Sequence, residues 1–84
     1  MNEPYWIEWA DDSGDPARNE LGTFATPAEL VAGLAGLLNQ LGHADHAAAQ
    51  LGYRPLPDLA AALKPGQQHE LDLPTGRLYF GLAQ

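Results

Sequence analysis

Three histidines are the residues of this chain best suited to metal chemistry. His43 and His46 are three positions apart, so on a helix they would lie one turn apart on one face, with Asp45 between them in sequence. His69 or a carboxylate would have to complete the ligand set. Two histidines near a helix start are more often simply solvated. A small metal-binding protein using these histidines is therefore the most distant of three hypotheses, and we expect no metal and no cofactor.

The acidic segment that begins at Asp11 carries the other side chains able to do chemistry. Its alternating oxygen ligands resemble the start of a calcium loop, but Pro16 stands where that loop needs Gly, and Gly22 where it needs Glu. Asp11 and Asp12 could act as paired carboxylates only if burial raised a pKa, which a polar loop does not provide. Ser13, the only serine, is surrounded by carboxylates that would oppose an alkoxide. We therefore expect no catalytic residues and no enzyme.

Length and composition indicate one small domain spanning residues 1–84. The chain has no cysteine, which excludes disulfides and thiolate metal sites. Its first residues lack the basic and apolar segments of a secretory signal, and no window approaches about 20 apolar residues. We expect a soluble, cytoplasmic protein of modest stability.

The negative charge is concentrated in the first third of the chain. Residues 1–29 contain seven acidic residues and one Arg, a net charge of −6, whereas residues 30–84 contain four acidic and three basic residues, a net of −1. Such a surface repels phosphate backbones and anionic lipids and attracts basic protein surfaces. The sequence therefore predicts a basic protein partner, with neither nucleic acid nor a membrane as a ligand.

The best-specified element is a helix over residues 26–41. Its aliphatic residues recur at helical spacing, Thr26 and Glu29 form a predicted capping box in which Glu29 bonds back to the Thr26 amide, and Gly42 suits the position after the end. Its other face carries small residues, including Gly33 and Gly36, each costing about 1 kcal/mol relative to Ala. We expect another backbone, from a later helix or a partner, to approach this face.

Strands and short helices complete an α+β pattern. The segments 43–50 and 58–64 are predicted to be short helices, the second ending at Lys64. Alternating apolar residues predict four strands: Tyr5–Ala10, Glu20–Ala25, Gln68–Leu73 and Arg77–Leu82. The expected fold is a small, mostly antiparallel four-stranded sheet in the order ββ-ααα-ββ, covered on one face by the helices.

The first strand places an aromatic side chain beside a carboxylate. Tyr5, Ile7 and Trp9 alternate with Trp6 and Glu8, so one set faces the core and the other is left for a surface. Aromatic and acidic residues on one surface suit a binding site for a basic partner. The predicted partner-binding residues are Trp6, Glu8, Asp11, Asp12, Asp15 and Glu20.

The order of elements also suggests a family. A strand pair, a helix opened by Thr26-Pro27-Ala28-Glu29-Leu30, and a strand reading Gly76-Arg77-Leu78-Tyr79-Phe80-Gly81-Leu82 resemble small bacterial immunity proteins that neutralise polymorphic toxins. The likeness covers about half the chain. It departs from the family by inserting two short helices and by ending soon after the glycine-containing strand. It implies no catalytic residues, only an inhibitory contact with another protein.

These observations favour a non-catalytic protein-binding module whose acidic surface docks on a basic partner, with immunity-like or antitoxin-like inhibition as its concrete form. The first alternative is a structural or regulatory homo-oligomer joined through the small-residue helix face. The metal-binding hypothesis is third.

Overall fold

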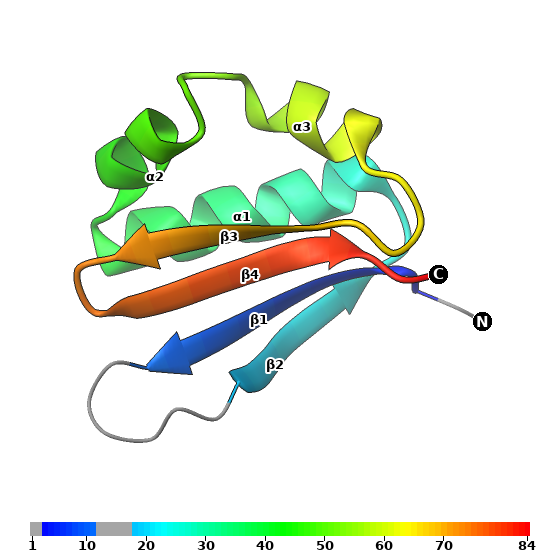
Figure 1. Ribbon diagram of the computed structural model, residues 1–84, viewed down its shortest axis with the longest axis horizontal. Helices are drawn as coiled ribbons and strands as arrows, with labels where there is room; N and C mark the ends of the chain where they lie inside the picture. Colours follow the sequence, from blue (N-terminus) through cyan, green and yellow to red (C-terminus); the bar gives the residue numbers. More distant parts are fainter. Residues whose placement is uncertain (1–2, 12–17) are drawn as a thin grey trace.

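A four-stranded antiparallel sheet with three helices on one face forms the molecule (Figure 1). This computed structural model describes residues 3–11 and 18–84, and the side chain of Arg18 lies outside the description. The α+β class and the order ββ-ααα-ββ are as predicted. The elements are β1 (Tyr5–Asp11), β2 (Arg18–Phe24), α1 (Pro27–Leu41), α2 (Ala44–Gln50), α3 (Leu56–Ala62), β3 (Gln68–Leu73) and β4 (Gly76–Leu82).

The two hairpins join through their first and last strands. The strand order is β2-β1-β4-β3, so β1 and β4 pair in the middle of the sheet and β2 and β3 form its edges. Ile7 lies opposite Phe80, and Glu8 lies opposite Tyr79. Because side chains alternate along a strand, this register also fixes which residues of the two hairpins share a face.

One extra residue interrupts the pairing of β1 with β2. Ile7 lies opposite Gly22, but the next residue, Glu8, lies opposite Glu20, so Leu21 is the additional residue of a β-bulge. Gly22 and Phe24 therefore face the helices, while Glu20 lies beside Glu8 on the other face. Regular alternation would have placed Glu20 on the helix side.

Both ends of α1 are capped by its own sequence. The Thr26 hydroxyl accepts a hydrogen bond from the Glu29 amide at 3.2 Å. The Glu29 carboxylate accepts from the Ala25 amide at 3.1 Å, one residue before the predicted Thr26 partner. At the other end Gly42 adopts the left-handed conformation with φ 75°, and its amide donates to the Asn39 carbonyl.

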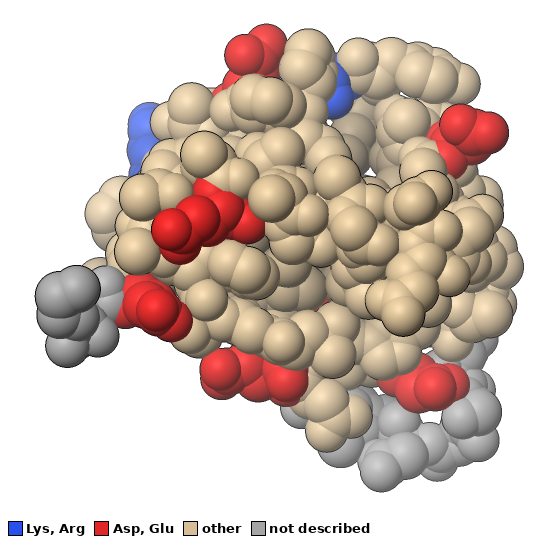
Figure 2. All heavy atoms as spheres, turned by 180° about the vertical axis from the view of Figure 1, so that it is seen from behind, with Lys and Arg blue, Asp and Glu red and all other residues tan. Residues whose placement is uncertain are grey.

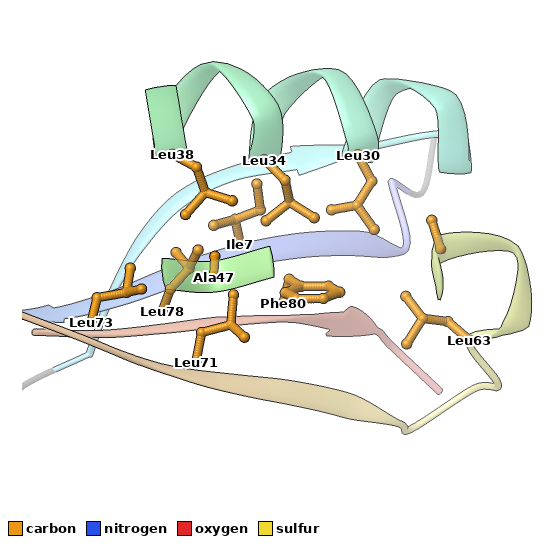
Figure 3. Packing of buried hydrophobic residues seen from close by; sticks show 11 residues of the cluster. Ile7, Leu30, Leu34, Leu38, Ala47, Leu63, Leu71, Leu73, Leu78 and Phe80 are labelled. Carbon is orange, nitrogen blue, oxygen red and sulfur yellow. The ribbon is translucent and has the colours of Figure 1, made fainter. Parts of the chain in front are cut away.

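The hydrophobic core lies between α1 and the sheet (Figure 3). Leu30, Leu34 and Leu38 of α1 are fully buried and point towards the sheet. They meet the buried side chains of the strands, which are Ile7, Leu71, Leu73, Leu78 and Phe80. Ala47 of α2 and Leu63, just after α3, belong to the same cluster.

The third helix is displaced from its predicted position. It begins at Leu56 and ends at Ala62, two residues earlier at each end than expected. Lys64 precedes Pro65, whose ring disfavours the helical conformation of the residue before it. Leu63 is already extended, with φ −62° and ψ 133°, so Lys64 does not lie in the last helical turn.

The two glycines of α1 have different surroundings. A Cβ on Gly33 would lie 2.7 Å from the Phe24 ring, so α1 does approach another element closely there. That neighbour is a side chain of β2 and not the backbone of a later helix. A Cβ on Gly36 would have no atom within 4 Å among the residues described. The expected backbone approach therefore fails at both positions within the chain.

Candidate functional site

The sheet face opposite the helices is open and carries most of the polar side chains of the strands. The register places Trp6 and Glu8 of β1 on this face, with Tyr79 of β4 opposite Glu8. Glu70 of β3 lies opposite Tyr79 in turn. We call this surface the open face. Its side chains are those of Glu3, Trp6, Glu8, Glu20, Thr23, Gln68, Glu70, Asp72, Arg77 and Tyr79.

Trp6 packs closely against β4 because the residue opposite it, Gly81, has no side chain. Its Cα lies opposite Gly81, and a Cβ on Gly81 would lie 2.9 Å from the Trp6 ring. The indole therefore lies across the glycine and stays half-buried. Trp9 packs against Gly76 in the same manner on the helix side of the sheet. Trp6 thus forms a fixed aromatic platform in the open face.

Carboxylates gather at the β1–β2 side of the open face. Glu8 and Glu20 lie opposite each other across the two strands. Glu3 reaches the same surface, because its carboxylate accepts a hydrogen bond of 2.5 Å from the hydroxyl of Thr23, which lies opposite Trp6. Like charges opposite each other on a sheet repel, so the facing of Glu8 and Glu20 makes this side of the open face negative among the described side chains.

Arg77 neutralises part of the β3–β4 side. Its guanidinium lies 3.0 Å from Asp72 and 3.4 Å from Glu70, both exposed. A hydrogen bond with Tyr79, and then the charges of Asp72 and Glu70, raise the pKa of Arg77 above its usual value. Among the described side chains, the open face has five carboxylates and one guanidinium, a net charge of −4.

The structure brings three of the six predicted partner-binding residues together. Trp6, Glu8 and Glu20 share the open face. Asp11 is the last residue of β1, lies opposite Gly76 and is exposed. By strand alternation it lies on the same side of the sheet as Trp9 and not on the open face. Asp12 and Asp15 lie outside the described residues, as does Ser13 of the calcium-like pattern.

Four residues of the β3–β4 hairpin belong to the same surface. Glu70, Asp72, Arg77 and Tyr79 can be assigned to one face of that hairpin from alternation alone. Their place beside Trp6 and Glu8 depends on the pairing of β1 with β4, which joins residues about 70 positions apart. No local sequence signal specifies that pairing.

The side of the molecule opposite the open face carries a broad uncharged area. Figure 2 views the molecule from behind Figure 1, where α1 lies behind the sheet. Acidic side chains stand apart from one another around this area.

The histidines do not form a three-ligand site. His43 lies beside the β3–β4 turn, with its Nε2 3.2 Å from the Thr75 hydroxyl. His69 lies near the start of β3, and its ring centroid is 5.1 Å from that of Phe80. The two contacts lie at opposite ends of β3, since His69 is near its start and Thr75 is in the turn that follows Leu73. In the part of the chain that the structure describes, no three His, Cys, Asp or Glu side chains come close enough to hold a metal ion.

No family model matches the chain, and no curated sequence or solved structure is significantly similar to it. Within residues 3–11 and 18–84, no helix is both long and apolar enough to cross a membrane. The fold and the open face define the class of this molecule as a small α+β domain with an acidic sheet surface.

Proposed function

We propose that this protein is a non-catalytic binding module that docks its open face on a basic surface of another protein. The observation that carries the proposal is the net charge of −4 that the described side chains of the open face give around Trp6 and Tyr79, on a sheet face that the described helices leave uncovered. Carboxylates at the rim of an aromatic surface steer a basic partner and speed its encounter, while the aromatic rings supply buried contact area.

Inhibition of a basic enzyme or toxin is the concrete form that we favour. An acidic sheet with a fixed shape can occupy a basic groove that normally holds a phosphate backbone, and it needs no catalytic residue to do so. The likeness to toxin-immunity proteins in the α1 opening and in β4 supports the same form. The acidic surface disfavours nucleic acid and anionic membranes as ligands.

The test is a matched pair of double substitutions. Immobilised protein captures the partner from extract of the source cells, and association is then measured at low and moderate salt. Glu8→Gln with Glu20→Gln should weaken association about tenfold and flatten its salt dependence. Asp45→Asn with Asp58→Asn makes the same change in net charge on the exposed helices α2 and α3, and should leave association unchanged. Equal effects of the two pairs, or a captured partner that is itself acidic, would refute the proposal.

A further inference from the structure

The two edges of the sheet end in different ways. At β3 the side chain of Gln50 pairs with the backbone of Asp72, because its Oε1 accepts from the Asp72 amide at 2.7 Å and its Nε2 donates to the Asp72 carbonyl. A side-chain amide therefore occupies that edge as another strand would. At the other edge no described strand pairs with the outer side of β2. Backbone donors and acceptors of an edge strand can pair with a further strand.

An apolar groove runs beside the open edge. It lies between β2 and α1, has a volume of about 430 Å³, and is lined by Leu21, Phe24, Gly33, Gly36, Leu37 and Gln40. Leu21 is 48% exposed, and a side chain at Gly36 would have space around it. Small residues on α1 and an extended strand thus border a hollow that can receive apolar side chains.

The bulge determines which side of the β2 edge is apolar and which is acidic. It places Leu21 beside the groove and Glu20 on the open face, opposite Glu8. A strand added alongside β2 would direct alternate side chains to these two sides. Side chains over the groove should be aliphatic, and those beside Glu20 should be basic.

We propose that the partner contributes an extended segment of about five residues, alternating Lys or Arg with aliphatic residues, which adds to β2 as a fifth strand. This inference rests on the proposed function, since it describes how the basic partner is held. Charge complementarity selects this occupant over a second copy of the chain. Pairing β2 of two copies would bring two acidic open faces to adjoining edges, with like charges near the junction.

A synthetic heptapeptide of alternating Lys and Val, with both ends blocked, tests the proposal by NMR titration of the labelled protein. Backbone shifts should move at residues 21–24 and 33–37. Two further peptides are N-methylated on alternate residues, one on every Lys and the other on every Val. Successive amides of a strand point in opposite directions, so one methylated set should lose about tenfold or more in affinity and the other should bind nearly as well. Equal affinity of the two sets would overturn strand addition.

Variants of the protein separate the groove from the open face. Gly36→Leu fills the groove and should abolish peptide binding, whereas Asn39→Leu, exposed on the same helix and outside the groove, should not. Shifts confined to the surroundings of Trp6, Glu70 and Tyr79, insensitive to Gly36→Leu, would overturn the edge site and leave the proposed function standing. An absence of any binding of the alternating peptide would also overturn the edge site. Self-association abolished by Gly36→Leu would assign the groove to a second copy and refute the basic segment. The proposed function itself is refuted separately, by equal effects of the two acidic double substitutions or by capture of an acidic partner.

Discussion

The glycines fall into two kinds: some lie where neighbouring atoms leave no space for a side chain, and others lie where a side chain would fit. In β4, a Cβ on Gly81 would lie 2.5 Å from the Gln67 carbonyl oxygen as well as against Trp6. A Cβ on Gly76 would meet the Ala10 carbonyl oxygen and the Trp9 ring. Backbone atoms in a sheet cannot move aside without disturbing the ladder. Positions 76 and 81 therefore require glycine, because neighbouring backbone and a tryptophan ring occupy the space of a Cβ at each.

Replacement of Gly81 by Ala should lower the free energy of unfolding by about 1–3 kcal/mol, because the added methyl group overpacks a site bounded by backbone. Urea unfolding measures this loss. Because the clash also lifts the indole, the near-ultraviolet circular dichroism of the tryptophans should change in the folded protein. A variant as stable as the original would contradict the packing described for Trp6.

For Gly36 we expect a gain in stability on replacement by Ala, in contrast to the loss expected at Gly81. Its surroundings are open and it lies inside a helix, so Gly36→Ala should raise the free energy of unfolding by up to about 1 kcal/mol. In a domain of this size that corresponds to an increase of about 4–8 °C in Tm. A loss of stability would mean that α1 is more closely packed at this point than the structure shows.

Among the elements, β3 is the edge strand whose stability depends on a helix. The amide of Gln50 holds the Asp72 backbone, and α2 thereby protects the outer side of the sheet. Gln50→Ala removes both hydrogen bonds and should cost about 1–2 kcal/mol. Hydrogen exchange of the Asp72 amide should accelerate by more than that of amides in β1.

Gln40→Ala serves as the matched control for this substitution. Gln40 is exposed on α1 and lines the groove, far in sequence from β3, so its truncation should leave exchange at Asp72 unchanged. If both substitutions accelerate Asp72 equally, the effect reflects global unfolding and not the edge contact.

The same elements show which features the sequence could predict. The limits of α1 follow from Thr26, Glu29 and Gly42, which act within one or two turns, and the β3–β4 hairpin follows from alternation around a short turn. The Leu21 bulge left no such signal, because a regular strand also accommodates this sequence. The restraint of Pro65 on the residue before it explains why Lys64 lies outside α3, but it does not explain why α3 begins at Leu56.

In the molecule as a whole, the proposed function depends on charges that a long-range strand pairing brings together. The predicted partner-binding residues lay only within residues 6–20, but the open face also takes Glu70 and Asp72 from β3. Arg77 offsets both. Alternation alone could therefore assign one face of β1 and one face of the β3–β4 hairpin. The place of Glu20 beside Glu8 required the bulge, and the union of the two hairpins required the pairing of β1 with β4.

Arg77→Gln should make the open face more negative, from −4 to −5 among the described side chains, so association with a basic partner should become about twofold faster at low salt. The change is opposite in sign to that expected for the Glu8 and Glu20 double substitution. Stopped-flow measurement of the association rate at several salt concentrations distinguishes the two. An equal slowing by both variants would indicate that Arg77 contacts the partner directly.

The two tryptophans of β1 give the molecule separate optical reporters of docking and of unfolding. Trp9 points to the helix side, where its fluorescence depends on the integrity of the core, and Trp6 lies on the open face, where it senses whatever covers that surface. A spectrum recorded from Trp6 alone, after Trp9→Phe, would therefore report occupancy without an attached dye. The emission of Trp9, read after Trp6→Phe, would show in parallel that the domain stays intact.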